Sequence, residues 1–156
     1  MSILLKKWEM PPIEKVHEAF SAVVDNRVNL NENFAKVSSS DYSKKYIIEW
    51  KDNEYSSNDN ASYYKGCIGY PVIAVLMLQN KIDFNVEIAK YFTGINWKAL
   101  NTKHKNNYSI AVAEILNQLQ NKGVDTDSIN AEVNRIYEQI KGIDILYKKS
   151  THLPPK

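Results

Sequence analysis

The side chains best suited to bind a ligand are concentrated in residues 53–71, NEYSSNDNASYYKGCIGYP. Carboxylate, amide and hydroxyl oxygens dominate the first half of this stretch, and two adjacent tyrosines follow. Such oxygens can bind cations or polar small molecules, and loops carry binding sites more often than packed surfaces do. The first candidate ligand site therefore comprises Asn58, Asp59, Asn60, Tyr63 and Tyr64.

A structural interpretation of the same stretch competes with the ligand site. A calcium loop starting at Asp52 would need glycine at its sixth position and glutamate at its twelfth, where the chain has Ser57 and Tyr63. One of the residues 58–60 is instead a suitable N-cap for a short helix. We favour this capped connection between a strand and a buried helix. An enzyme with its site in the loop 52–70 is a distant alternative.

The segment Gly66-Cys67-Ile68-Gly69 matches the Gly-x-x-Gly with which KH domains clamp a nucleic-acid backbone. Its two central residues are apolar, whereas polar or basic residues serve a phosphate clamp best. We expect Gly66 to end one helix and Gly69 to precede the next.

The second candidate site interleaves basic and aromatic side chains within residues 97–108. Such a segment could contact phosphates and stack bases, which makes it the best nucleic-acid candidate in the chain. A solvated connection between helices, with its aromatic residues in the core, explains the segment without a ligand and is the interpretation we favour. The candidate residues are Trp97, Lys98, Lys103, Lys105 and Tyr108.

The sequence contains no recognisable catalytic, metal-binding or nucleotide-binding motif. Its single cysteine, Cys67, has no local histidine signature, and the three histidines have no partner at metal-ligand spacing. Walker, Rossmann and Gly-x-Ser-x-Gly patterns are absent from the sequence. We therefore expect no catalytic residue, no metal and no cofactor, and we lean against an enzyme.

Size and composition predict one soluble domain. The 156 residues suffice for a substantial core, and the net charge of +2 does not by itself imply a nucleic-acid or membrane partner. The longest apolar run, 72–78, is far too short to span a membrane. A lone cysteine and the absence of a signal-peptide pattern favour a cytoplasmic location. We expect one domain over 1–150 and a mobile tail at 151–156.

Hydrophobic periodicity predicts an α+β fold, with a small antiparallel sheet packed against about five helices. Alternation at 45–51 indicates a strand, paired in a hairpin with 34–38, and either 2–8 or 143–149 could add a third strand. The run at 70–80 predicts a buried helix, and 107–122 with 127–141 predicts a C-terminal antiparallel αα-hairpin. The predicted core comprises Phe20, Ile48, Val72, Ile73, Val75, Leu76 and Leu116.

These features favour a non-enzymatic binding or interaction module that self-associates as a homo-oligomer. Ten tyrosines and three tryptophans motivate the second half of this hypothesis, since both residue types are enriched at interfaces. Nucleic-acid binding through 97–108 is the alternative.

Overall fold

The structure is a computed structural model that describes residues 6–156. Over these residues it has an α+β fold with seven α-helices, one 3-10 helix and a mixed six-stranded sheet of order β1-β6-β5-β4-β3-β2. The strands are β1 (Lys6–Lys7), β2 (Val28–Leu30), β3 (Phe34–Ser38), β4 (Lys45–Lys51), β5 (Glu54–Ser57) and β6 (Leu146–Tyr147). The helices are α1 (Lys15–Val24), α2 (Asn60–Lys65), α3 (Tyr70–Leu78), α4 (Val86–Ala89), the 3-10 helix η1 (Lys90–Phe92), α5 (Trp97–Lys103), α6 (Tyr108–Asn121) and α7 (Thr126–Lys141).

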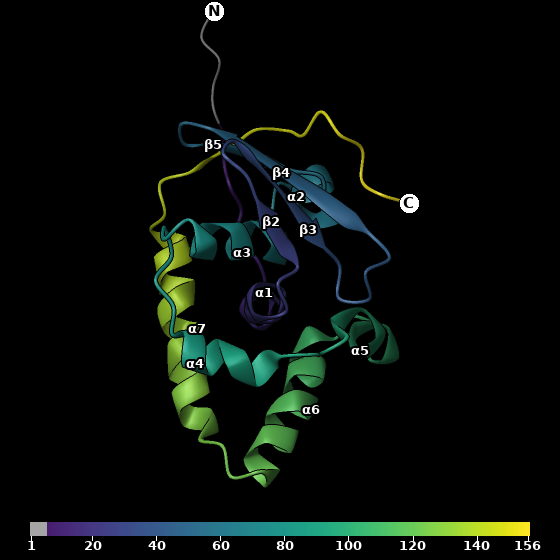
Figure 1. Cartoon of the computed structure of the whole chain (residues 1–156), viewed down its shortest axis with the longest axis vertical. Coiled ribbons are helices and arrows are strands. Elements are labelled where there is room, and N and C mark those ends of the chain that lie inside the picture. The colour runs from purple at the N-terminus through teal and green to yellow at the C-terminus, as the bar shows by residue number, and fades with distance from the viewer. Residues whose placement is uncertain (1–5) are drawn as a thin grey trace, which may run out of the picture.

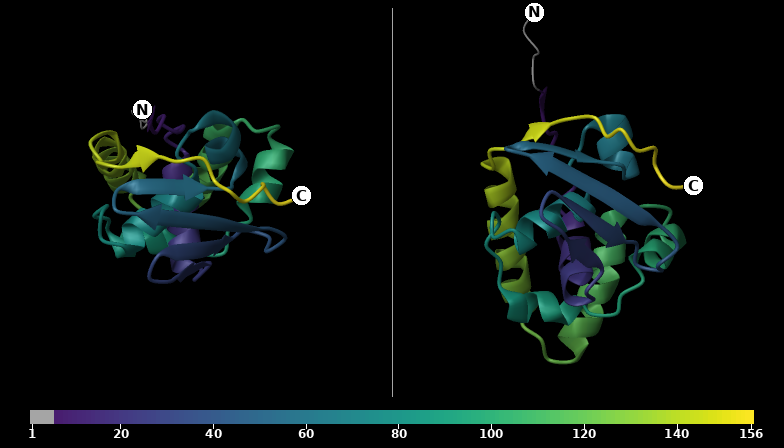
Figure 2. Two further views of the ribbon diagram at one scale, coloured as in Figure 1. Left: turned by 90° about the horizontal axis from the view of Figure 1, so that it is seen from above. Right: turned by 45° about the horizontal axis from the view of Figure 1, so that its top comes forward.

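Most helices lie on one side of the sheet, with α3 next to the strands and α1 beyond it (Figure 1). The C-terminal segment runs across the strands on the other side (Figure 2). There the Asn58 amide donates to the Leu153 carbonyl at 3.0 Å, and His152 Nε2 lies 3.2 Å from Glu49 Oε1. These contacts place residues 151–156 along the sheet.

The predicted hairpin is confirmed, but the sheet is larger than predicted. Strands β3 and β4 pair antiparallel with the bounds expected from the sequence. Strand β5 was missed because its residues, EYSS, do not alternate in polarity. It forms because the turn at Asp52 and Asn53, with Asp52 at φ 55°, folds the chain back onto β4.

Both candidates for a further strand take part in the sheet. Lys6–Lys7 pairs with Leu146–Tyr147, which in turn lies parallel to β5. Residues 2–5 of the first candidate lie outside the described part of the chain.

Helix α3 confirms the predicted buried helix. Gly69 precedes it, and Pro71 occupies the first turn, where the missing amide hydrogen of proline costs no bond. Its residues 71–77 are buried, and it packs between α1 on one side and strands β2 and β4 on the other. An uninterrupted apolar run is stable as a helix here because every side of it is covered.

The predicted antiparallel αα-hairpin is wrong in its packing. Helices α6 and α7 have nearly the expected bounds, but they diverge from their connecting loop (Figure 1). The segment that includes α4 and η1 runs between them, and its beginning is bonded to α7: Glu132 accepts from the Asn85 amide at 2.6 Å. Leu116 is therefore only half-buried on α6, whereas the other six predicted core residues are fully buried.

No helix within residues 6–156 is both long enough and apolar enough to cross a membrane.

His17 is a buried histidine on α1 that hydrogen-bonds only within its own helix. Its ring lies against Phe92, its Nδ1 is 3.3 Å from the Glu14 carbonyl, and its Nε2 has no hydrogen-bond partner among the described residues. Burial lowers the pKa of His17 from 6.5 to about 4, because the charged form loses its hydration.

We predict that His17 makes the protein lose stability as the pH falls from 6.5 to 4. In this window the unfolded chain binds a proton at His17 and the folded chain does not, so acid favours unfolding. The loss at pH 4 should reach about 3 kcal/mol. Urea unfolding between pH 7 and pH 4 measures it. His17→Leu should flatten the curve, whereas His152→Leu, at a partly exposed histidine, should not. A curve unchanged by His17→Leu would refute the assignment.

Candidate functional site

At the N-terminal end of the first candidate ligand site, the side chains form hydrogen bonds within the protein that stabilise the fold. Asn58 links the strands to the C-terminal segment: its Oδ1 accepts from the Ile47 amide at 2.7 Å while its Nδ2 donates to Leu153. Asp59 is the N-cap of α2, and its carboxylate accepts from the Ser62 amide at 3.2 Å. The adjacent Asn60 is exposed in the first turn of α2.

The two tyrosines of this candidate site lie on α2. Their rings contact each other edge to face at 5.0 Å, and Lys149 Nζ lies 4.6 Å from the centre of the Tyr63 ring. Tyr64 is 70% exposed. Tyr64 therefore lies at the surface, whereas Asp59 is buried. Ligand binding by these residues stays a prediction.

The Gly-x-x-Gly segment has the structural role expected from the sequence. Gly66 ends α2 in the left-handed region, at φ 65°, where a side chain would be strained. Gly69 precedes α3 with extended backbone and lies directly against the Asp59 carboxylate. A Cβ atom at position 69 would overlap that carboxylate.

The second candidate site is divided between the core and the surface. Trp97 is buried, and its indole donates to Ser21 Oγ at 2.8 Å. Lys103 pairs with Glu114 at 2.8 Å on the exposed side of α5 and α6, and Lys105 is exposed in the loop between these helices. The remaining two residues of this candidate, Lys98 and Tyr108, line a cavity to which Trp97 also contributes.

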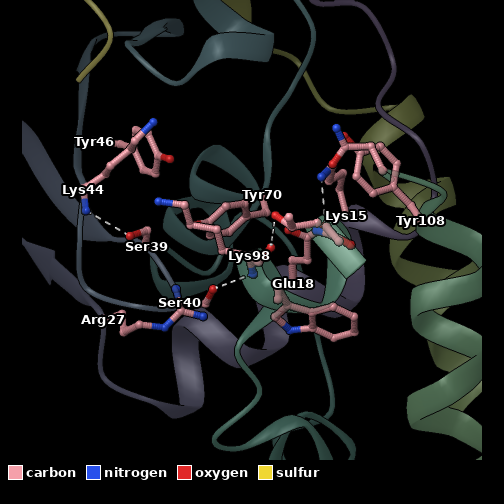
Figure 3. A pocket seen from close by; sticks show the side chains of 14 residues that line it. Lys15, Glu18, Arg27, Ser39, Ser40, Lys44, Tyr46, Tyr70, Lys98 and Tyr108 are labelled. Atoms are coloured by element: carbon pink, nitrogen blue, oxygen red, sulfur yellow. Dashed lines mark hydrogen bonds and ion pairs between the residues drawn. The ribbon is translucent and has the colours of Figure 1, made fainter. Parts of the chain in front are cut away.

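That cavity has a volume of about 210 Å³ and lies where α1, α3, α5 and the loop 39–44 meet. Figure 3 shows Lys44, Tyr46 and Ser39 at one side of the view and Lys15 and Tyr108 at the other, with Tyr70 and Lys98 between them. Its lining comprises Lys15, Glu18, Arg27, Ser39, Ser40, Lys44, Tyr46, Tyr70, Trp97, Lys98, Asn101, Thr102, Asn106 and Tyr108.

Arg27 is the most constrained charge in the lining. Asn26, at φ 55°, turns the chain after α1, so that the Arg27 carbonyl accepts from the Ser38 amide at 2.9 Å. The guanidinium is held by one bond, from Nη1 to the Ser38 carbonyl at 2.8 Å. Its Nε and Nη2 are buried without a hydrogen-bond partner in the described part of the chain. An arginine cannot shed its proton, so this buried charge has unmet donors.

The other charges of the lining differ in how far the protein neutralises them. Lys15 Nζ lies 2.8 Å from Glu18 Oε2 and 3.8 Å from the centre of the Tyr108 ring. Lys98 Nζ lies 3.4 Å from Asp41 Oδ2 at the entrance loop. Lys44 forms no ion pair with any residue between 6 and 156. Four cations and one carboxylate therefore line the cavity; Arg27 has a long ion pair, with Asp25 Oδ2 3.9 Å from its Nε, and Lys44 has none among the described residues.

Two tyrosines add neutral polar groups to the lining. The Tyr46 and Tyr70 rings meet edge to face at 6.4 Å, and the Arg27 guanidinium lies 5.9 Å from the centre of the Tyr70 ring. Burial raises the pKa of Tyr70, and the Tyr46 phenol adds to that effect. Burial is the main cause of the raised pKa of Tyr46, and the negative charge of Asp59 raises it further. Both phenols keep their protons at neutral pH and can donate to a ligand.

Sequence spacing could not reveal this cavity. Its charged residues come from positions 15 and 18 on α1 and from positions 27, 44 and 98 elsewhere in the chain, and they form no local motif. The only usable signal was the group of basic and aromatic residues from 97 onward, which identified Trp97, Lys98 and Tyr108 but attributed them to a nucleic-acid surface. No cluster of three or more histidine, cysteine or acidic side chains between residues 6 and 156 is arranged to hold a metal ion.

Comparison with known proteins adds a family but no activity. The sequence model of a family described as "Uncharacterised conserved protein UCP014422" matches residues 8–146. No curated protein and no solved structure matches the chain.

We predict that Gly69→Ala destabilises the protein by about 1–3 kcal/mol, the usual cost of forcing an extra group into a packed site. The new methyl group would overlap the Asp59 carboxylate, although the backbone conformation itself suits alanine. Gly142→Ala is the matched control: Gly142 also has negative φ, and its nearest neighbours lie 4.0 Å from the added atom. Thermal unfolding of both variants tests this, and equal stabilities would contradict it.

Proposed function

This chain belongs to the family of uncharacterised conserved protein UCP014422, and we propose from its cavity that it is a non-enzymatic binding module for a small anionic ligand. The observation that carries the proposal is the charge of the lining, where Lys15, Arg27, Lys44 and Lys98 stand against the single carboxylate of Glu18. A bound carboxylate or phosphate would be attracted by this excess positive charge, and its oxygens could accept hydrogen bonds from lysine ammonium groups.

The other charged residues of the lining also favour an anionic ligand. Lys44 is a cation without an ion pair among the described residues, while the carboxylate of Glu18 is already engaged by Lys15. A cation entering the cavity would meet this excess of positive charge, whereas an anion would be attracted by it. The lining contains neither histidine nor cysteine, which favours binding over nucleophilic catalysis.

The cavity also limits the size of the ligand. Its volume of about 210 Å³ is below the range of about 300–1,000 Å³ that is typical of pockets for drug-sized molecules. A free phosphate or a small organic acid suits it better than a nucleotide. Nucleic-acid binding stays a prediction, and the burial of Trp97 does not favour base stacking by that residue.

We predict that inorganic phosphate binds and raises the melting temperature at constant ionic strength. Binding to the folded state alone stabilises it, by about 2.7 kcal/mol when the ligand concentration is 100 times Kd. Lys44→Gln should weaken phosphate binding by roughly 10-fold, as expected for loss of one charge-assisted contact. Calorimetric titration measures both effects.

The matched control for this experiment is Lys45→Gln. It makes the same change of net charge at the next residue, which is exposed and does not line the cavity, so it should leave phosphate affinity unchanged. Arg27→Gln should also weaken phosphate binding, because it removes one of the four positive charges of the lining. Equal affinities of the parent chain and Arg27→Gln, or no phosphate binding at low ionic strength, would refute the proposal.

Self-association remains a separate prediction of the same proposal. Tyr42, Tyr64 and Tyr91 keep 65%, 70% and 45% of their surface exposed, so they are free to contact a second copy. Light scattering over a range of concentrations should give a mass above the 18.0 kDa of one chain. A monomer mass at every concentration would remove the homo-oligomer and leave the anion site unaffected.

A further inference from the structure

We propose that the ligand of the cavity is a small monocarboxylic acid with an uncharged body, and that its carboxylate binds the ammonium group of Lys44. This inference rests on the proposed function and defines its ligand class. It starts from the ion pairs of the lining, which leave Lys44 as the one cation without a carboxylate partner among the described residues.

Each of the other three cations has a carboxylate of the protein as its partner. Lys15 Nζ lies 2.8 Å from Glu18 Oε2, and Lys98 Nζ lies 3.4 Å from Asp41 Oδ2. The long ion pair of Arg27, described above, spans 3.9 Å. The protein therefore supplies three carboxylates for the four cations of the lining, which leaves one positive charge for a ligand.

Lys44 is held at the cavity through its backbone. Its amide donates to Ser39 Oγ at 3.0 Å, and its carbonyl accepts from the Ser39 amide at 2.8 Å. The residue is half-buried, and Figure 3 shows it at the same side of the view as Ser39. Because the backbone is fixed by these two bonds, the ammonium group stays at the cavity and can donate a charge-assisted hydrogen bond to a ligand carboxylate.

A second negative charge on the ligand would find no further cation without a partner. It would have to compete with Glu18 for Lys15 or with Asp41 for Lys98. Either competition brings two carboxylates to one ammonium group, and like charges at close range repel each other. The second charge would therefore lose hydration without gaining a partner of its own. Phosphate remains a ligand in its singly charged form.

The rest of the lining suits an uncharged body. Four of its residues are aromatic, namely Tyr46, Tyr70, Trp97 and Tyr108. Burial raises the pKa of both Tyr46 and Tyr70, so these phenols stay neutral and add no negative charge at neutral pH. The volume of about 210 Å³ limits the ligand to a small acid.

The experiment compares butyrate, succinate and butyramide by calorimetric titration at constant ionic strength. The three compounds have carbon chains of equal length and differ in charge: butyrate is a monoanion, succinate a dianion and butyramide neutral. Butyrate should bind roughly 10-fold more tightly than either of the others, the usual effect of one gained or lost contact to a charged group. Lys44→Gln should remove the preference for butyrate over butyramide, whereas Lys45→Gln, at an exposed residue outside the lining, should keep it.

Asp41→Asn tests the balance of charges in the lining. Asp41 Oδ1 accepts the bonds that shape the loop, from the Ser43 amide at 3.0 Å and from Ser39 Oγ at 2.9 Å, whereas Oδ2 faces Lys98. Asparagine keeps the first oxygen and removes the charge, so Lys98 becomes a second cation without a carboxylate. The variant should bind succinate at least as tightly as butyrate. Asp144→Asn is the matched control: it makes the same change of net charge at an exposed residue outside the lining, and should keep the preference for butyrate.

The outcomes separate this inference from the proposed function. Equal binding of succinate and butyrate to the parent chain would overturn the single charge of the ligand while the anion site stands. A preference for butyrate over butyramide that survives Lys44→Gln would overturn the role of Lys44, and a preference over succinate that survives Asp41→Asn would overturn the balance of charges. Binding of phosphate but not of butyrate would overturn the choice of a carboxylate. Failure of phosphate, butyrate and succinate to bind would refute the proposed function itself.

Discussion

Burial of helix α3 is the constraint from which the arrangement of the cavity follows. A helix with apolar residues on all sides must be covered on all sides, and the sheet and α1 provide that cover. Polar groups can then emerge only at the ends of the helix. At its beginning, Gly69 packs against the Asp59 carboxylate and Tyr70 enters the cavity lining. Just beyond its end, Gln79 accepts from the Tyr55 hydroxyl at 2.7 Å.

Helix α1 contributes residues both to this core and to the charged lining of the cavity. Val16 and Phe20 are fully buried, while Lys15 and Glu18 lie on the side of the helix that borders the cavity. Helix α1 is also held against α5, because Ser21 Oγ accepts a hydrogen bond from the Trp97 indole. The cavity is therefore built largely on helices and a strand, which hold functional groups more precisely than loops do.

Sequence reasoning succeeded where the signal is local and failed where it depends on tertiary contacts. The hairpin of β3 and β4 and helix α3 were predictable because alternation and an uninterrupted apolar run report burial directly. Strand β5 and the divergence of α6 from α7 were not, because a turn and an intervening segment decide them. Of the cavity lining, Trp97, Lys98 and Tyr108 were named from the sequence, whereas the burial of Arg27 beside them is visible only in three dimensions.

The charged residues of the cavity differ in how closely a carboxylate of the protein is paired with them. Those that are closely paired serve the fold, and the others are available to a ligand. The chain neutralises Lys15 with Glu18, so it can place a carboxylate beside a cation where the fold requires one. Arg27 is compensated less closely, by a long ion pair with Asp25. The Asp25 carboxylate accepts from the Gly94 amide at 3.0 Å and 3.2 Å and stays 3.9 Å from Arg27 Nε, beyond hydrogen-bond distance. The positive charge of Arg27 and Lys44 is therefore only partly compensated by the protein, and an anion bound in the cavity would stabilise the folded state through its attraction to that charge.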